Sequence, residues 1–171
     1  MEEVYIKQIE EWTERRINNI LFDSDKDDWK ENTTVFGERI WNKEHIIIII
    51  EDSEGNKFGG YVNCKIDKVD NFVYDSQSFL FSLESNRMKK FDNKQQQYAF
   101  KLFNQFCGWL FAFGCGLIGY YDDIQVYKEN NKTKSRCKQL LFEYEGIENE
   151  LCGKEDPKCF TPKRIIVIEM K

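Results

Sequence analysis

The sequence predicts an α+β protein that is mainly β, with a central sandwich of two antiparallel sheets edged by a few helices. Three observations support this fold class. Residues 46–50 are five consecutive isoleucines, which predict a strand covered on both faces. A turn and a return strand follow this run directly. Short apolar or aromatic segments, separated by turns, then recur as far as the C-terminus.

The length and composition of the chain fit a single folded domain. Its 171 residues are 41% hydrophobic and 15% aromatic, which provides a substantial core and excludes a disordered chain. The net charge of −5 argues against a protein that wraps nucleic acid, because such domains are usually strongly basic. We predict an N-terminal helix over residues 1–20 that packs on one domain over residues 21–171.

Residues 3–20 have the apolar spacing of a helix. Tyr5, Ile9 and Trp12 fall on one face, which predicts a surface helix that docks on the domain through these side chains. The acidic excess of the chain lies in residues 1–31, so the outer face of this helix is an alternative partner-binding surface.

An acidic turn is predicted after this helix. Asp23, Asp25 and Asp27 have the first three spacings of a calcium-binding EF-hand loop. The sixth position, where that loop needs glycine, is Asp28, and the twelfth, where it needs glutamate, is Thr34. The sequence therefore excludes an EF-hand, and we expect a turn capped by aspartate side chains.

A β-hairpin is predicted from the isoleucine run onward. Gly55 and Asn56 suit the positive φ angles of its turn, and residues 57–64 form the return strand. Gly59 and Gly60 interrupt this strand, which indicates either a β-bulge or a close approach of neighbouring backbone.

Further strands are predicted along the rest of the chain, joined by short turns. Aromatic side chains alternate in one of them, as is typical of a strand with one buried face. The predicted strands are residues 78–83, 109–113, 116–121, 124–127 and 164–169. Helices after the first are expected only as short connections.

The termini and the uncharged segments predict a soluble, cytoplasmic protein. The first residues are acidic and lack the apolar stretch of a secretory signal. Residues 102–121 are uncharged, but their glycines and amides leave too short an apolar run for a membrane span.

The cysteines are expected to be free thiols, because a reducing compartment does not maintain disulfides. They are Cys64, Cys107, Cys115, Cys137, Cys152 and Cys159. None forms a Cys-x-x-Cys pair and His45 is the only histidine, so we expect neither a zinc site nor a Cys–His nucleophile. We predict no metal and no cofactor.

Two segments of the chain are locally basic. Residues 86–101 contain Arg87, Lys89, Lys90, Lys94 and Lys101. The second group precedes an acidic stretch over residues 139–156 and consists of Lys128, Lys132, Lys134, Arg136 and Lys138. Solvated loops explain many such patterns, and the functional interpretation is a surface that docks an oppositely charged protein. The second group is the candidate docking surface.

The order of the motifs resembles that of the TLDc domain family. The hairpin has that family's apolar strand, turn and Phe-Gly-Gly motif, and a Phe-Leu-Phe strand and a glycine-rich block follow. The matching positions are Asp52, Gly55, Phe58, Gly59, Gly60, Phe79, Phe81, Gly114 and Gly116. The resemblance extends over about residues 15–171. At the end of the chain, residues 168–171 keep the family's glutamate and lack its tryptophan.

The resemblance implies a fold of two antiparallel sheets and a class of function. TLDc proteins are associated with resistance to oxidative stress, and several bind the vacuolar proton pump and alter its assembly. The family brings no agreed catalytic residues, so its motif positions are expected to have turn and packing roles. The resemblance therefore implies a non-enzymatic module that binds a protein, with peripheral subunits of the proton pump as expected partners.

Two alternatives from other functional classes remain open. One is thiol-based peroxide detoxification by Cys107 or Cys115, although the apolar neighbours of both offer no positive charge to stabilise a thiolate. The other is a nucleic-acid-binding or regulatory protein that uses the two basic segments, which its acidic net charge disfavours.

Overall fold

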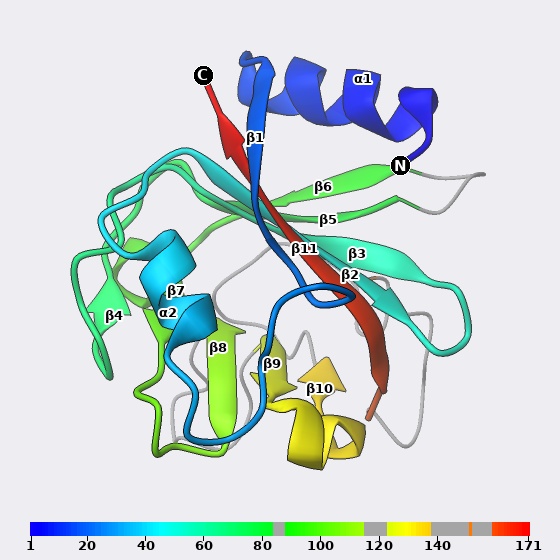
Figure 1. Ribbon diagram of the computed structural model, residues 1–171. Coiled ribbons are helices and arrows are strands. Elements are labelled where there is room, and N and C mark those ends of the chain that lie inside the picture. The colour runs from blue at the N-terminus through cyan, green and yellow to red at the C-terminus, as the bar shows by residue number, and fades with distance from the viewer. Residues whose placement is uncertain (84–87, 115–122, 138–150, 152–158) are drawn as a thin grey trace.

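The computed structural model describes residues 1–83, 88–114, 123–137, 151 and 159–171, and these form two antiparallel sheets (Figure 1). The order of the first sheet is β1 (Ile17–Asp23), β11 (Pro162–Met170), β2 (Ile46–Asp52), β3 (Lys57–Val62), β5 (Phe79–Ser82) and β6 (Lys89–Asp92). The order of the second is β10 (Arg136–Cys137), β9 (Ile124–Tyr127), β8 (Trp109–Phe113), β7 (Phe100–Leu102) and β4 (Phe72–Val73). The predicted mainly β fold of two antiparallel sheets is confirmed.

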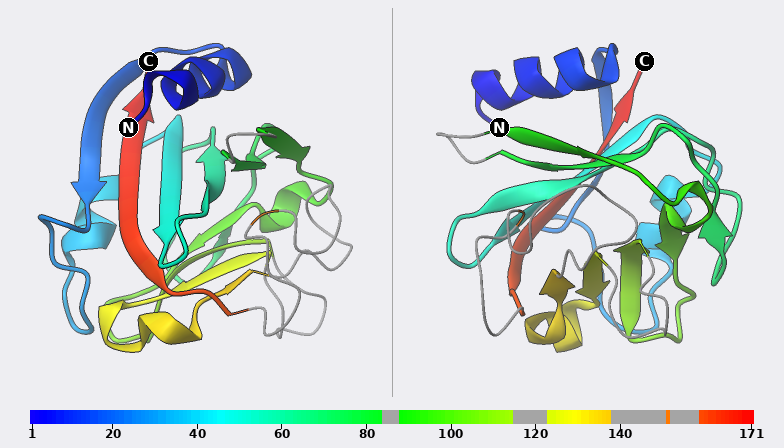
Figure 2. Two further views of the ribbon diagram at one scale, coloured as in Figure 1. Left: turned by 90° about the vertical axis from the view of Figure 1, so that its right-hand side faces the viewer. Right: turned by 180° about the vertical axis from the view of Figure 1, so that it is seen from behind.

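Helical segments lie at the margins of this sandwich. They are the α-helices α1 (Glu3–Thr13) and α2 (Val35–Ile40) and the short 3-10 helices η1 (Gln96–Tyr98) and η2 (Glu129–Lys134). Two views show that α1 lies across the face of the first sheet that points away from the second (Figure 1, Figure 2). No helix among the described residues is both long enough and apolar enough to cross a membrane.

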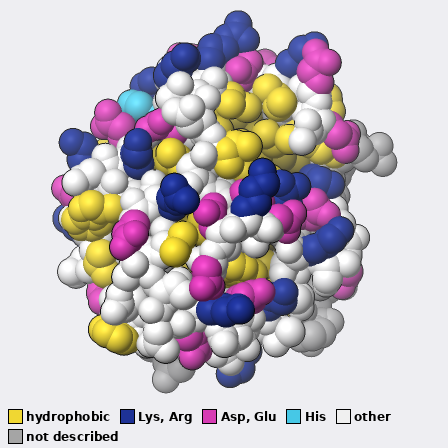
Figure 3. Space-filling view, viewed as in Figure 1, with side chains coloured by type: hydrophobic (Ala, Val, Ile, Leu, Met, Phe, Trp, Pro, Cys, Tyr) yellow, Lys and Arg dark blue, Asp and Glu magenta, His cyan; other side chains and the backbone are white. Residues whose placement is uncertain are grey.

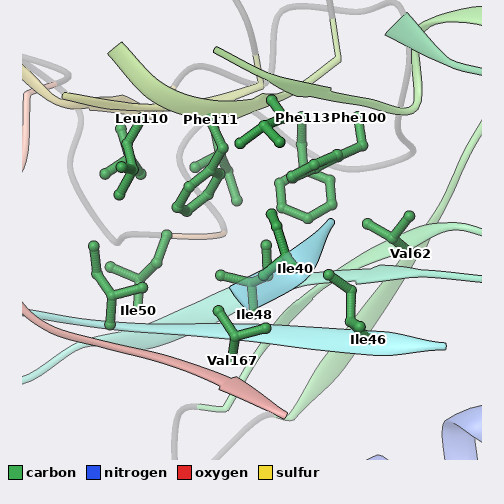
Figure 4. Packing of buried hydrophobic residues seen from close by; sticks show 14 of the residues in the cluster. Ile40, Ile46, Ile48, Ile50, Val62, Phe100, Leu110, Phe111, Phe113 and Val167 are labelled. Atoms are coloured by element: carbon green, nitrogen blue, oxygen red, sulfur yellow. The ribbon is translucent and has the colours of Figure 1, made fainter. Parts of the chain in front are cut away.

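The isoleucine run forms the central strand β2, between β11 and β3. Ile46, Ile48 and Ile50 are fully buried and point from the first sheet toward the aromatic side chains of the second (Figure 4). Those side chains include Phe111 and Phe113 of β8, which are also fully buried. Successive side chains of a strand point to opposite faces, so the remaining isoleucines need a cover on the other side.

Helix α1 covers the other face of β2. Ile47 and Ile49 belong to a second buried cluster that also contains Tyr5 and Ile9 of α1, with Trp12 packed against it. The prediction that the isoleucine strand is covered on both faces is therefore confirmed. It explains how five consecutive β-branched residues are kept away from water.

The turn between β2 and β3 is built around Asp52. Its carboxylate accepts hydrogen bonds from the backbone N–H groups of Glu54 and Asn56, each at 2.9 Å, and from the side-chain amide of Asn56. Gly55 has a φ of +90°, a conformation that side chains strongly disfavour. The predicted hairpin is confirmed.

Gly59 and Gly60 are required by close packing rather than by a bulge, because the β2–β3 register is continuous. A Cβ atom at Gly59 would overlap the backbone carbonyl oxygen of Ile48. A Cβ atom at Gly60 would lie 2.5 Å from the ring of Phe113 and 3.0 Å from the side chain of Leu80. Of the two predicted explanations, the close approach holds.

The N-terminal helix is shorter than predicted. The helix expected over residues 3–20 ends at Thr13, where Glu14 adopts a left-handed conformation with a φ of 54°. The chain then forms β1 at the edge of the first sheet, and reciprocal backbone hydrogen bonds of 2.8 Å join Arg16 to Lys171. The predicted boundary after residue 20 falls inside this strand. Pairing with β11 overrides the helical spacing of the later apolar residues.

The other predicted strands have mixed outcomes. Residues 78–83, 109–113, 124–127 and 164–169 coincide with β5, β8, β9 and β11 within the usual end effects. The strand predicted over residues 116–121 lies entirely outside the described residues. The short strands β4, β6, β7 and β10 and the helix α2 were missed because two to six residues carry too little periodicity to be recognised.

Candidate functional site

The motif positions of the sequence lie in turns or in the core. Asp52 and Gly55 form the hairpin turn, and the buried ring of Phe58 packs edge-on against Phe160 with 5.0 Å between ring centroids. Phe79 and Phe81 are buried beneath α1. These positions therefore have turn or packing roles in the sandwich.

The glycine-rich block is described only in part. Gly114 has a φ of +73°, and a Cβ atom there would overlap the carboxylate of Asp123, which is buried. Gly116 lies outside the described residues. Close packing therefore requires a glycine at position 114, as it does at Gly59 and Gly60 of the hairpin motif.

Lys128 does not belong to an exposed basic surface, which corrects the prediction. The residue is 2% exposed, and its ammonium group donates hydrogen bonds to the backbone carbonyls of Asn104 and Gln105 at 3.0 and 2.6 Å. Burial lowers the pKa of this lysine. The side chain turns inward because it satisfies two carbonyl groups of a neighbouring loop.

The other predicted docking residues that the structure describes have two different environments. Lys134 and Arg136 are exposed at the end of η2 and on β10. Lys132 is half-buried, with its ammonium group 5.7 Å from the centroid of the Trp29 ring. Lys138 lies outside the described residues. Lys132, Lys134 and Arg136 thus form what we call the basic edge.

The basic segment over residues 86–101 is partly used for packing. Lys90 pairs with Asp92 at 3.1 Å and lies 4.8 Å from the centroid of the Phe79 ring. Lys101 lies over the ring of Phe72 in β4 at 5.2 Å and over that of Phe103, just after β7, at 4.9 Å. Lys89 and Lys94 lie within the described residues, whereas Arg87 does not. These contacts give Lys90 and Lys101 structural roles, which weakens the case for a phosphate-binding surface.

The described cysteines offer little support for thiol chemistry. Cys64, Cys107 and Cys159 are free thiols and Cys137 is buried, whereas Cys115 and Cys152 lie outside the described residues. Burial, followed by the negative charge of Asp75, raises the pKa of the Cys64 thiol. A raised pKa leaves less of the reactive thiolate at neutral pH.

The single histidine has a structural environment. The Nδ1 atom of His45 lies 3.0 Å from the side-chain oxygen of Asn63, and the hydroxyl group of Tyr61 donates to the same oxygen. No group of three or more histidine, cysteine or acidic residues within the described ranges could hold a metal ion.

An apolar groove lies between α2 and the loop that joins β7 to β8. Its volume is about 530 Å³, and most of its surface is apolar. The side chains that line it include Phe36, Trp41, Val69, Phe103, Phe106 and Leu110. Figure 3 shows hydrophobic side chains in separate groups on the side of the molecule where α2 lies. We call this feature the α2 groove.

Phe106 is the most exposed of the large hydrophobic side chains in the described part of the chain, at 79%. It lies in the β7–β8 loop, beside two other exposed apolar residues of the α2 groove, Trp41 and Val69. Scattered exposed hydrophobic residues are common, but several that line one groove indicate an interaction surface.

Hydrogen bonds hold the β7–β8 loop in one shape. The carboxylate of Asp70 accepts from the backbone and side-chain N–H groups of Asn104 at 3.1 and 2.7 Å. The side-chain oxygen of Asn104 then accepts from the backbone N–H groups of Phe106 and Cys107 at 2.8 and 3.1 Å. The ammonium group of Lys128 donates hydrogen bonds to two carbonyl groups of this loop, those of Asn104 and Gln105. Phe106 is therefore presented to solvent on a loop whose shape is fixed before any partner binds.

Sequence reasoning missed the α2 groove because its walls come from distant parts of the chain. Residues 33–41 form one wall, and residues 102–110 form the other, together with Val69. The one local signal is Phe106 itself, an aromatic residue that follows Asn104 and Gln105 in a polar turn.

Fold and site together define a mainly β sandwich domain that exposes an apolar groove beside a rigid loop. The sequence model of the TLDc domain matches residues 2–161, which include α1 and β1. The chain therefore belongs to the TLDc domain family, in agreement with the resemblance noted in its motifs. No curated protein sequence matches the chain.

Proposed function

We propose that this protein is a non-enzymatic interaction module of the TLDc type, which docks on a protein partner through the α2 groove. The observation that carries the proposal is Phe106, exposed on a loop that hydrogen bonds hold in place. Aromatic side chains of this kind supply much of the binding energy at protein interfaces, and a preformed loop lowers the entropy cost of association.

The basic edge follows Lys128, which lines the α2 groove, along the chain through η2. The backbone N–H of Glu31 donates to the side chain of Asn130 in η2, and the backbone N–H of Lys128 donates to the carbonyl of Gly108. Exposed Lys134 and Arg136 would favour approach to an acidic protein surface, because complementary charges raise association rates.

Family membership suggests the partner. We propose the peripheral, cytosolic subunits of the vacuolar proton pump, with a cytoplasmic location and a contribution to oxidative-stress resistance. This part of the proposal rests on what the TLDc resemblance implies, and the α2 groove supplies a surface on which such a subunit could dock.

Replacing Phe106 with alanine is expected to weaken partner binding by roughly tenfold or more, because an interface aromatic is lost. The melting temperature should change little, since the side chain is mostly in water. Binding of the full chain to purified peripheral pump subunits, followed by biolayer interferometry, measures the effect.

Tyr74→Ala is the matched control for this experiment. Tyr74 is also an exposed aromatic residue, at 59%, but it does not line the α2 groove. The control should bind like the wild type. Equal binding by Phe106→Ala and the wild type would remove the groove from the interface, and absence of binding at micromolar concentration would reject these subunits as partners.

A further inference from the structure

Lys128 is a buried positive charge at the α2 groove, and among the described residues it forms no ion pair. It lines the groove, yet no acidic group within the described ranges comes within the 4.0 Å of an ion pair. Buried charges in proteins are normally paired, because removing an ion from water is costly. The described residues therefore compensate the charge of the ammonium group only in part.

Within the described ranges, two of the three N–H donors of Lys128 have acceptors. An ammonium group has three N–H donors, and two of them reach the carbonyl groups of Asn104 and Gln105. Within the part of the chain that the structure describes, the third donor has no acceptor. A ligand in the α2 groove can supply one.

The acidic residues nearest to Lys128 are engaged with neutral groups. Glu31 accepts a hydrogen bond of 2.6 Å from the side chain of Asn131, and Asp70 accepts two from Asn104. Their charges, together with Cys107, raise the pKa of Lys128, whereas burial lowers it and has the larger effect. Glu31 and Asp70 thus offset part of the charge of Lys128 without forming an ion pair with it.

At the rim, the carboxylate of Glu38 accepts a hydrogen bond of 2.6 Å from the hydroxyl group of Thr34. The rest of the groove is largely apolar. A complementary ligand therefore combines apolar groups with one negative group, which must enter deeply enough to meet Lys128.

The exposure of Phe106 favours a protein segment over a small molecule as this ligand. A small molecule confined to the groove would leave the largely exposed face of Phe106 in water. A protein segment can cover the groove and Phe106 at the same time, and interface aromatics pair with apolar partners in this way.

We propose that the α2 groove binds a partner segment in which an acidic side chain is flanked by aliphatic or aromatic residues, with its carboxylate accepting a hydrogen bond from Lys128. This inference rests on the proposed function, since it specifies the partner of the same groove. It makes the groove selective for acidic over basic apolar segments.

Selection from a displayed library of random 12-residue peptides, with the full chain as target, tests this inference. Enriched peptides should contain aspartate or glutamate between apolar residues, and their binding should fall with Phe106→Ala and with Trp41→Ala. For a synthetic peptide from the selection, a Glu→Gln or Asp→Asn change should weaken binding by roughly tenfold or more, because a charge-assisted hydrogen bond is lost. This change leaves the protein, and the β7–β8 loop that Lys128 supports, intact.

The double variant Lys134→Glu/Arg136→Glu separates Lys128 from the basic edge. The difference between the acidic and the amide peptide should persist in this variant if Lys128 receives the carboxylate. Loss of the difference would assign it to the basic edge and overturn the inference.

The remaining outcomes separate this inference from the proposed function. Peptides that need Phe106 and Trp41 but are neutral or basic would overturn the inference and leave the groove as a docking site. Peptides that bind the Phe106→Ala and Trp41→Ala variants as tightly as they bind the wild type would overturn both the inference and the proposed function. Recovery of no binding peptide would reject a short segment as the ligand, whereas the pump-subunit experiment tests docking independently.

Discussion

Replacing Gly59 with alanine is expected to destabilise the fold by about 4 kcal/mol or more, enough to unfold many domains of this size. Gly59 lies in β3, opposite Ile49 of β2 on one side and Phe81 of β5 on the other. The added methyl group would overlap the carbonyl oxygen of Ile48. A backbone atom cannot move away by changing rotamer, so the two central strands would have to separate.

Urea denaturation followed by circular dichroism measures this effect, and Gly37→Ala is its control. Gly37 lies within α2, where a Cβ atom would meet nothing within 4 Å. Alanine is the better helix former, so this variant should be unchanged or more stable by up to about 1 kcal/mol. A Gly59→Ala protein within about 1 kcal/mol of the wild type would contradict the close-packing explanation.

Local sequence patterns predicted the centre of the fold well. The isoleucine run, the turn at Gly55 and the glycines of the return strand each specify their structure within a few residues. The extent of the first helix was wrong because Ile17 and Ile20 have a spacing that fits either a helix or a strand. Only pairing with β11, about 150 residues away in the chain, decides between them.

The candidate site was much less predictable, because its properties depend on contacts between distant segments. Lys128 lies in a basic stretch of the sequence and gives no sign that it turns inward beneath Asn104 and Gln105. Phe106 could equally have been buried, since exposure depends on how Asp70 and Asn104 fix the loop. Local composition therefore suggested the basic edge, whereas contacts between distant segments create the α2 groove.

The acidic turn after β1 gives a second large effect, because one of its aspartates is a buried ion-pair partner. The side chain of Asp23 is 5% exposed, and Arg164 donates two hydrogen bonds to its carboxylate at 3.0 and 2.7 Å. Arg164 also pairs with Asp25 at 3.1 Å. The turn thus joins β1 to β11 through charge as well as through backbone pairing.

Replacing Arg164 with methionine is expected to cost about 3 kcal/mol of stability at pH 7, because it leaves the carboxylate of Asp23 buried without its main partner. The neighbouring variant Lys163→Met is the control. Lys163 pairs with Glu51 at 3.2 Å from an exposed position, and such surface pairs contribute about 0 to 1 kcal/mol. Similar losses in the two variants would show that Asp23 does not depend on Arg164.

The dependence of this difference on pH follows from the pKa of Asp23. Hydrogen bonding to Arg164 holds that pKa below its usual value, so the pair stabilises the fold fully above about pH 4. The stabilisation is lost as the pH falls through the lowered pKa of the folded state. Without Arg164 the main cause of this lowering is absent, so acidification removes the stabilisation by the ion pair from the wild type and has none of it to remove from the variant. The difference in free energy of unfolding between the wild type and Arg164→Met should therefore shrink as the pH falls from 7 to below about 4. Denaturation curves recorded across this range measure it, and a constant difference would contradict the ion-pair argument.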